Sequence, residues 1–147
     1  MNSKALIIIA PVVALIAAAA GWLFLKPAPA AVDETAQPGL VHTLADPFVV
    51  NLADSGGVPR FVKVGVALRL ARSSDDLVTP AGTGAPATVE GEAQVRDIVI
   101  AALQARTSTA LGTARGRAAL KREIVRRITR DTDIDVLDVY YTEFAVQ

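Results

Sequence analysis

The sequence predicts an α+β protein: one apolar N-terminal helix, followed by a domain of antiparallel strands packed with two helices. Three observations carry this prediction. Residues 5–25 are twenty-one consecutive residues whose side chains hold no charge, amide or hydroxyl. Between residues 40 and 70 apolar and polar residues alternate, which is the period of a half-buried strand. Between residues 95 and 128 the apolar spacing becomes three and four, the period of a helix buried on one face.

The run that begins at Ala5 and ends at Leu25 is the predicted membrane anchor. In hydrocarbon every backbone N–H and C=O group must be bonded within the segment, so the run should be helical. At 1.5 Å per residue it would span about 30 Å, the thickness of a bilayer core. Trp22 lies near one end, where an aromatic residue fits the membrane interface. Residues 1–4 should stay in the cytoplasm, and the acidic residues that follow the anchor fit the outer side.

A cleaved secretory signal is the alternative to an anchor. The tripeptide Ala28-Pro29-Ala30 resembles the small-x-small pattern of a cleavage site. The apolar run is longer than the ~7–15 residues of a typical signal, which favours a retained anchor. Residues 26–39 are then a linker, because they hold three prolines and show no apolar period.

The domain is expected to occupy residues 40–147 and to open with two strands. The first covers residues 40–52, and a turn that contains glycine and proline follows it. The second covers residues 60–70, where valine and leucine recur at every second position from Val62 to Leu70. This alternation buries one face, and the turn should pair the two strands as a hairpin.

A loop, two helices and a last strand are expected in the rest of the domain. Residues 72–88 are rich in Gly, Pro, Ser and Thr and form a long loop, which is expected to be mobile or functional. A helix follows and ends at the threonines and serine of residues 107–109. After a loose stretch with two glycines a second helix covers residues 117–130, and the β-formers of residues 131–147 close the domain as a strand. The expected buried residues of the first helix are Val95, Ile98, Val99, Ala102 and Leu103.

Reactive side chains are scarce in this chain. It has no cysteine, which excludes disulfides, thiolate nucleophiles and sulfur-ligated metals. Its one histidine, His42, is expected to be solvated or locally bonded rather than catalytic. Asp131, Asp133 and Asp135 are spaced like the start of a calcium loop, but Val136 occupies the glycine position and no glutamate ends the loop. The sequence thus predicts no enzyme, no cofactor, no metal site and no small-molecule substrate.

One charged cluster lies near the C-terminus. Seven basic residues fall between positions 115 and 130, with Glu123 the one acid before the terminal aspartates. One interpretation is a solvated helix face whose cations suit the C-terminal end of the helix dipole. The other is a basic face that meets an acidic edge on a neighbouring subunit, so that copies line up in a ring or arc. The candidate contacts are Arg115, Arg117, Lys121, Arg122, Arg126, Arg127, Arg130, Asp131, Asp133 and Asp135.

Nucleic acid is a poor partner for the domain. Every acidic residue lies beyond Lys26, so the segment after the anchor is slightly acidic although the whole chain has a formal net charge of zero. A domain that coats nucleic acid needs an excess of basic residues instead. The sequence therefore favours a protein partner or the membrane over a polyanion.

The chain resembles the flagellar basal-body-associated FliL family. The resemblance runs from the anchor to the last residue: a short N-terminus with a single membrane helix, a proline-rich linker, and then five segments of the domain. No segment is specific alone, but their order along the chain is. The segments are residues 46–52 (DPFVVNL), 60–64 (RFVKV), 95–99 (VRDIV), 116–124 (GRAALKREI) and 139–147 (VYYTEFAVQ).

The resemblance implies a bacterial inner-membrane protein with a cytoplasmic N-terminus and a periplasmic domain. It implies an α+β domain similar to the stomatin/prohibitin type, which assembles into rings or arcs. The partners it implies are the membrane, further copies of the chain, the flagellar stator proteins and the basal-body ring. The implied role is non-enzymatic support of the stator, of torque and of swimming or swarming. Residues 73–87 are richer in glycine and proline than the family pattern.

One other function fits part of the sequence, and a third does not. A membrane-anchored periplasmic binding or assembly module unrelated to flagella would share the anchor, linker and domain. An enzyme would need a polar active-site cluster, which the sequence does not offer. Tethering holds the domain near the membrane and raises its effective concentration against other tethered partners, so weak contacts suffice. The linker and the charged cluster are the segments expected to carry those contacts.

Overall fold

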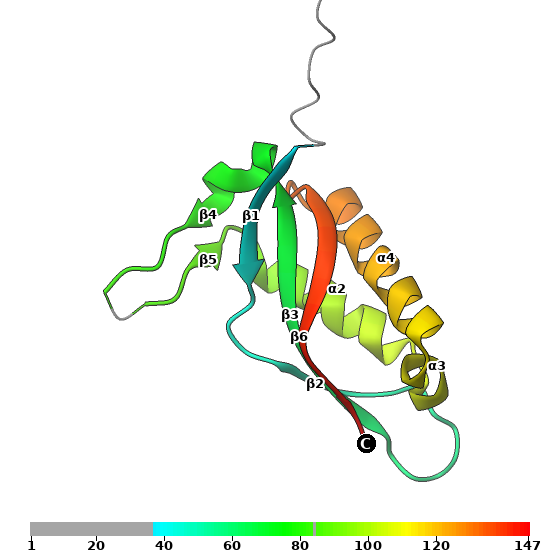
Figure 1. Ribbon diagram of the computed structural model, residues 1–147. Helices are drawn as coiled ribbons and strands as arrows, with labels where there is room; N and C mark the ends of the chain where they lie inside the picture. Colours follow the sequence, from blue (N-terminus) through cyan, green and yellow to red (C-terminus); the bar gives the residue numbers. More distant parts are fainter. Residues whose placement is uncertain (1–36, 84) are drawn as a thin grey trace, which may run out of the picture. The chain divides into compact units, whose positions relative to one another are not determined.

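The computed structural model of the protein describes residues 37–83 and 85–147. Strand β3 (Phe61–Ala71) lies at the centre of a four-stranded antiparallel sheet and pairs with the three other strands (Figure 1). Strand β6 (Val136–Val146) runs along nearly the whole of β3 on one edge. The predicted α+β class, with antiparallel strands and helices, is confirmed.

The opposite edge of β3 pairs with two short strands, β1 (Pro38–Thr43) and β2 (Phe48–Asn51). The single strand predicted over residues 40–52 is therefore wrong, although its antiparallel pairing with the following strand is confirmed. Between β1 and β2 the register with β3 shifts by two residues. Pro47 falls in this bulge, where its missing N–H removes no ladder hydrogen bond.

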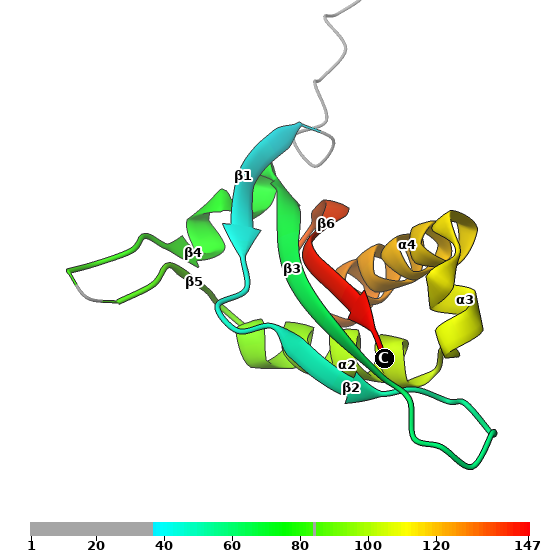
Figure 2. The same cartoon turned by 60° about the horizontal axis from the view of Figure 1, so that its bottom comes forward.

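Two long helices cover one face of the sheet (Figures 1 and 2). They are α2 (Glu92–Gln104) and α4 (Ala114–Asp131), joined through the short helix α3 (Ser108–Gly112). The predicted break after the first helix is confirmed, although it lies at residues 105–107. The predicted loose stretch is wrong, since α3 and the first turn of α4 occupy it. The hydroxyl oxygens of Thr107 and Thr113 accept N–H groups three residues on, at 3.3 and 3.0 Å. The threonines are thus N-caps that begin helices.

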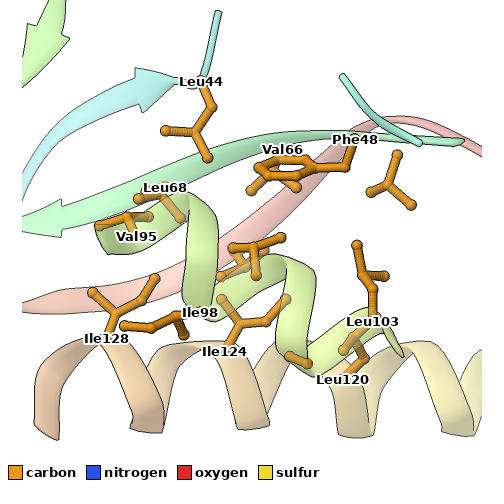
Figure 3. Close-up of a cluster of buried hydrophobic side chains, with 14 of the residues drawn as sticks. Leu44, Phe48, Val66, Leu68, Val95, Ile98, Leu103, Leu120, Ile124 and Ile128 are labelled. Atoms are coloured by element: carbon orange, nitrogen blue, oxygen red, sulfur yellow. The ribbon is translucent and has the colours of Figure 1, made fainter. Parts of the chain in front are cut away.

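The core fills the space between the sheet and the helices (Figure 3). Every second residue of β3 from Val62 to Leu70 is at most 1% exposed. The predicted stripe of α2 is buried against them, which confirms the helical period of that segment. The helix residues of this core are Val95, Ile98, Val99, Ala102 and Leu103 of α2 and Leu120, Ile124 and Ile128 of α4.

The segment predicted as a long loop holds more secondary structure than expected. It contains the 3-10 helix η2 (Arg72–Leu77) and a small hairpin of β4 (Val78–Thr79) and β5 (Thr88–Val89). Ser74 of η2 is buried, and its hydroxyl accepts the backbone N–H of Asp135 at 2.8 Å. This bond ties the segment to the entrance of β6, so part of it is anchored on the sheet.

The last strand begins at Val136 and not at residue 131 as predicted. Helix α4 runs through the first of these residues, and a turn follows it. In the turn the Thr132 hydroxyl donates to the carbonyl of Ile128 at 2.8 Å and accepts the N–H of Ile134 at 3.1 Å. A threonine that bonds backbone on both sides favours a turn over an extended strand.

The predicted membrane anchor, with Ala5, Trp22 and Leu25, lies outside the described residues, as do residues 26–36 of the predicted linker. Within residues 37–83 and 85–147, no helix combines the length and the apolarity that crossing a membrane requires.

Replacing Leu68 by Ala should lower the free energy of unfolding by about 2–5 kcal/mol, because the side chain is 0% exposed and its loss leaves a cavity. Val49→Ala is the control: Val49 is 66% exposed, and its truncation should cost less than about 0.5 kcal/mol. Urea unfolding of the full-length chain in detergent measures both values. Equal losses in the two variants would contradict the core described above.

Candidate interaction surface on helix α4 and strand β6

Helix α4 carries the charged cluster on the face that turns away from the core. Its fully buried residues Leu120, Ile124 and Ile128 recur four positions apart. At 3.6 residues per turn this spacing forms one stripe, so the polar residues between them lie on the flanks and the outer face. The Thr113 cap fixes where the helix begins and hence which side chains share each face.

Two bases of the cluster bind Glu123, the one acid of α4 before its last residue. Arg127 Nε lies 2.6 Å from Glu123 Oε1, and Arg126 donates to the other oxygen of the same carboxylate. The pairs are four and three residues apart, the spacing at which helical side chains meet. The hydrogen bond from Arg127 is the main cause that holds the pKa of Glu123 below its usual range.

A third base binds the acidic residue that ends the helix. Arg130 Nε and Nη2 each lie 2.7 Å from an oxygen of Asp131, in a two-bond fork. This hydrogen bonding lowers the pKa of the Asp131 carboxyl and raises that of the guanidinium. Asp131 is a candidate contact with a neighbouring subunit, and in the single chain its carboxylate already binds Arg130.

Two further bases contact groups of their own chain. Arg117 Nη1 donates to the carbonyl oxygens of the last two residues of α3, at 3.0 and 3.1 Å. Lys121 Nζ lies 5.4 and 5.1 Å from the ring centroids of Tyr140 and Tyr141 in β6. Burial raises the pKa of Tyr141 to about 12, and its hydroxyl donates to the carbonyl of Arg117 at 3.2 Å. These contacts fasten α4 to the sheet.

Arg115 and Arg122 are the bases of the cluster that the structure leaves exposed with no ion pair to another described residue. Arg122 borders a groove of about 310 Å³ between α4 and β6. The groove floor includes Val125 and Leu137, and Leu137 is 38% exposed although it is apolar. An exposed cation beside an apolar floor suits a protein partner that carries an acid and an apolar side chain.

The aspartates after α4 have different hydrogen-bond partners. Asp135 accepts a bond from the Ser73 hydroxyl at 3.1 Å, and Asp138 accepts the N–H of Val139 at 2.7 Å. Asp133 is exposed, and no described base lies within ion-pair distance of it. Across residues 37–83 and 85–147, no three His, Asp or Glu side chains gather as metal ligands.

No local pattern in the sequence marks a buried polar contact between β1 and α2. His42 of β1 is 3% exposed, and its Nε2 lies 3.3 Å from Glu92 Oε2 at the start of α2. The expectation of a solvated or locally bonded imidazole is wrong, because the side chain is buried and its partner lies 50 positions away. The pair fastens β1 to α2, and among the described residues it belongs to no group of three possible metal ligands.

Comparison with known proteins gives two matches. The family model described as "Flagellar basal body-associated protein FliL" matches residues 41–147. The curated "Flagellar protein FliL" of Aquifex aeolicus (strain VF5) is 30% identical over 110 residues. That alignment covers 74% of this chain and 62% of the relative, so the chain spans less than two thirds of the length of that curated relative.

The pairing of Glu123 predicts a specific pH dependence. A carboxyl whose pKa is lowered on folding contributes stability above its unfolded pKa, and the contribution is lost as the pH falls through the folded pKa. Between pH 6 and pH 3 the wild type should therefore lose about 0.5 kcal/mol more than Glu123→Gln, the size of a helical ion pair. Urea unfolding of both full-length chains at the two pH values measures the difference. Parallel losses would show that the pair contributes nothing.

Proposed function

The chain belongs to the FliL family of flagellar basal body-associated proteins, and from this premise we propose that it supports the stator units of the flagellar motor. In this proposal it is a non-enzymatic inner-membrane scaffold, held by residues 5–25, with its domain in the periplasm. Copies form a ring or arc around stator units and sustain torque, swimming and swarming. The observation that carries the proposal is the family match, which extends over residues 41–147 and so over nearly the whole described domain.

The exposed charges of α4 and of the following turn are the proposed contacts between copies. Arg115 lies in the first turn of α4, whereas Asp133 lies beyond its last residue. Arg115 and the last helical residue, Asp131, are about 24 Å apart at 1.5 Å per residue, so Arg115 and Asp133 of one copy cannot pair with each other. Opposite charges at opposite ends of one element favour a head-to-tail contact, the kind that closes into rings. Arg122 and the groove beside it extend the same surface.

Reversal of Arg115 and Arg122 to Glu should weaken this assembly. Both are preferable to Arg126 and Arg127, whose reversal would also break their bonds to Glu123. Arg60→Glu with Arg72→Glu makes the same charge change at exposed positions away from α4 and is the matched control. In sedimentation velocity of the full-length chain in detergent, the α4 variant should shift toward the monomer and the control should not. An identical distribution for both would contradict the assigned contacts.

Deletion of the gene should reduce swimming or swarming in soft agar while flagella still assemble. Complementation with the wild type or with the control variant should restore motility, and the α4 variant should restore it incompletely. Normal motility together with an envelope defect would contradict the flagellar role and favour a general periplasmic assembly module. Cell motility and the count of filaments per cell are the two measurements.

A further inference from the structure

The free edge of β2 borders a groove that the sequence did not predict. The groove has a volume of about 370 Å³ and lies between β2 and α2, which run side by side at one end of the sheet (Figure 2). Val49 and Asn51 line it from the strand, and Arg96, Ile100 and Gln104 line it from the helix. The charged cluster of α4 contributes nothing to it.

The backbone of this edge is unpaired over two residues. Leu52 donates to the Arg60 carbonyl at 2.8 Å, so in the antiparallel ladder the even-numbered residues of β2 bond to β3. The N–H and C=O groups of Val49 and Asn51 therefore point away from β3 into the groove. No other described backbone group bonds to them. An unpaired strand edge of this kind is a template for an added strand.

The two ends of the edge limit what it can accept. At one end the N–H of Ala53, the next outward-pointing residue after Asn51, already donates to the carbonyl of Arg106 at 2.8 Å. An added strand therefore cannot bond to this N–H group. At the other end Pro47 has no N–H to offer. An added strand would thus bond Val49 and Asn51 and would be about five residues long at this site.

The residues of α2 that line the groove determine which side chains an added strand can place there. Arg96, Ile100 and Gln104 follow one another at four-residue steps, about 6 Å apart at 1.5 Å per residue. Alternate residues of an extended strand are about 6.7 Å apart, so three of them match the three floor residues. Arg96 stacks on Phe48, with its guanidinium carbon 4.5 Å from the ring centroid. Its positive charge favours an acidic residue at the facing position of the added strand. Ile100 favours an apolar residue of the added strand at the position that faces it, and the long side chain of Gln104 leaves room for a small residue only.

We propose that residues 30–34 (AAVDE) of a second copy of the chain add to β2 as an antiparallel strand in this groove. In that register Glu34 meets Arg96, Val32 covers Ile100 and Ala30 lies beside Gln104. Asp33 then lies opposite Val49 and Ala31 opposite Asn51, the two residues of β2 with unpaired groups. Both the charge and the alternation of the segment fit the floor.

The segment has to come from another copy. Pro38 pairs with Ala71 at one end of β3, and Val49 pairs with Lys63 toward the other end (Figure 1). Those positions on β3 are about 26 Å apart at ~3.3 Å per residue. The six steps from Val32 to Pro38 reach at most about 22 Å when fully extended, so Val32 cannot enter the groove of its own chain. The inference therefore links the linker of one copy to the domain of the next.

Disulfide trapping tests the register directly. The chain has no cysteine, so single cysteines report without background. Directly opposite residues of a hydrogen-bonded antiparallel pair have Cα atoms about 5.5 Å apart, within the range of a disulfide. Full-length copies with Val49→Cys and copies with Asp33→Cys, carrying different tags, are expressed together and oxidised in the membrane. A mixed disulfide dimer should form. Val58→Cys, at a 69% exposed residue outside the groove, replaces Val49→Cys as the control.

A charge swap makes the test specific to the groove. Arg96→Glu in the Val49→Cys copy should lower the yield of mixed dimer about fivefold, the size expected for one partly exposed ion pair. Glu34→Arg in the Asp33→Cys copy should restore it. A yield no higher than the Val58→Cys control, or a swap that restores nothing, would overturn the proposal. This result is independent of the motility assay, so the inference and the proposed function can fail separately.

Discussion

Strand β3 uses both of its edges and its inward face at once, and the rest of the domain depends on this. One edge bonds to β6 over most of its length, and the other bonds to β1 and β2 in turn. The inward residues from Val62 to Leu70 meet α2 and α4. The loss of β3 would leave β1, β2 and β6 unpaired and the helices without a core. The segments on the outside of this frame are the ones free to bind partners.

The polar and charged side chains of the domain divide into those paired within the chain and those that no described residue pairs. Glu123 binds two arginines, Arg130 binds its neighbour Asp131, and His42 fastens β1 to α2. Because these side chains are paired within the chain, few of their hydrogen-bonding groups are left to bind a partner. What remains on α4 is sparse: two exposed bases and a shallow groove with an apolar floor. A surface of this kind suits weak contacts that become sufficient when copies are tethered to one membrane.

The sequence predicted the parts of the fold that have a clear period. The alternation around Val64 and the helical spacing around Ile98 are set by burial, so they appear directly in the residue order. Thr107 was misread because a hydroxyl that caps a helix also interrupts an apolar pattern. The break between β1 and β2 depends on a bulge against β3, which involves residues distant in sequence.

The candidate contacts were harder to predict for the same reason. The seven bases of the cluster could be counted in the sequence, but which of them are already bound could not, since Lys121 meets tyrosines of β6 only in the fold. The groove beside β2 combines a strand edge with a helix face more than forty residues away, and no local pattern marks it. Family membership was predicted from the order of weak segments and is confirmed by the match over residues 41–147.

Native-state hydrogen exchange of the membrane-reconstituted chain tests the central role of β3 most directly. If β3 organises the domain, its central amides, from Val64 to Leu68, should exchange only through global unfolding and be the slowest of the sheet. The amides of β1 and of the β4–β5 hairpin should open earlier, through local motions. Exchange of the central β3 amides at the rate of the hairpin amides would contradict the account.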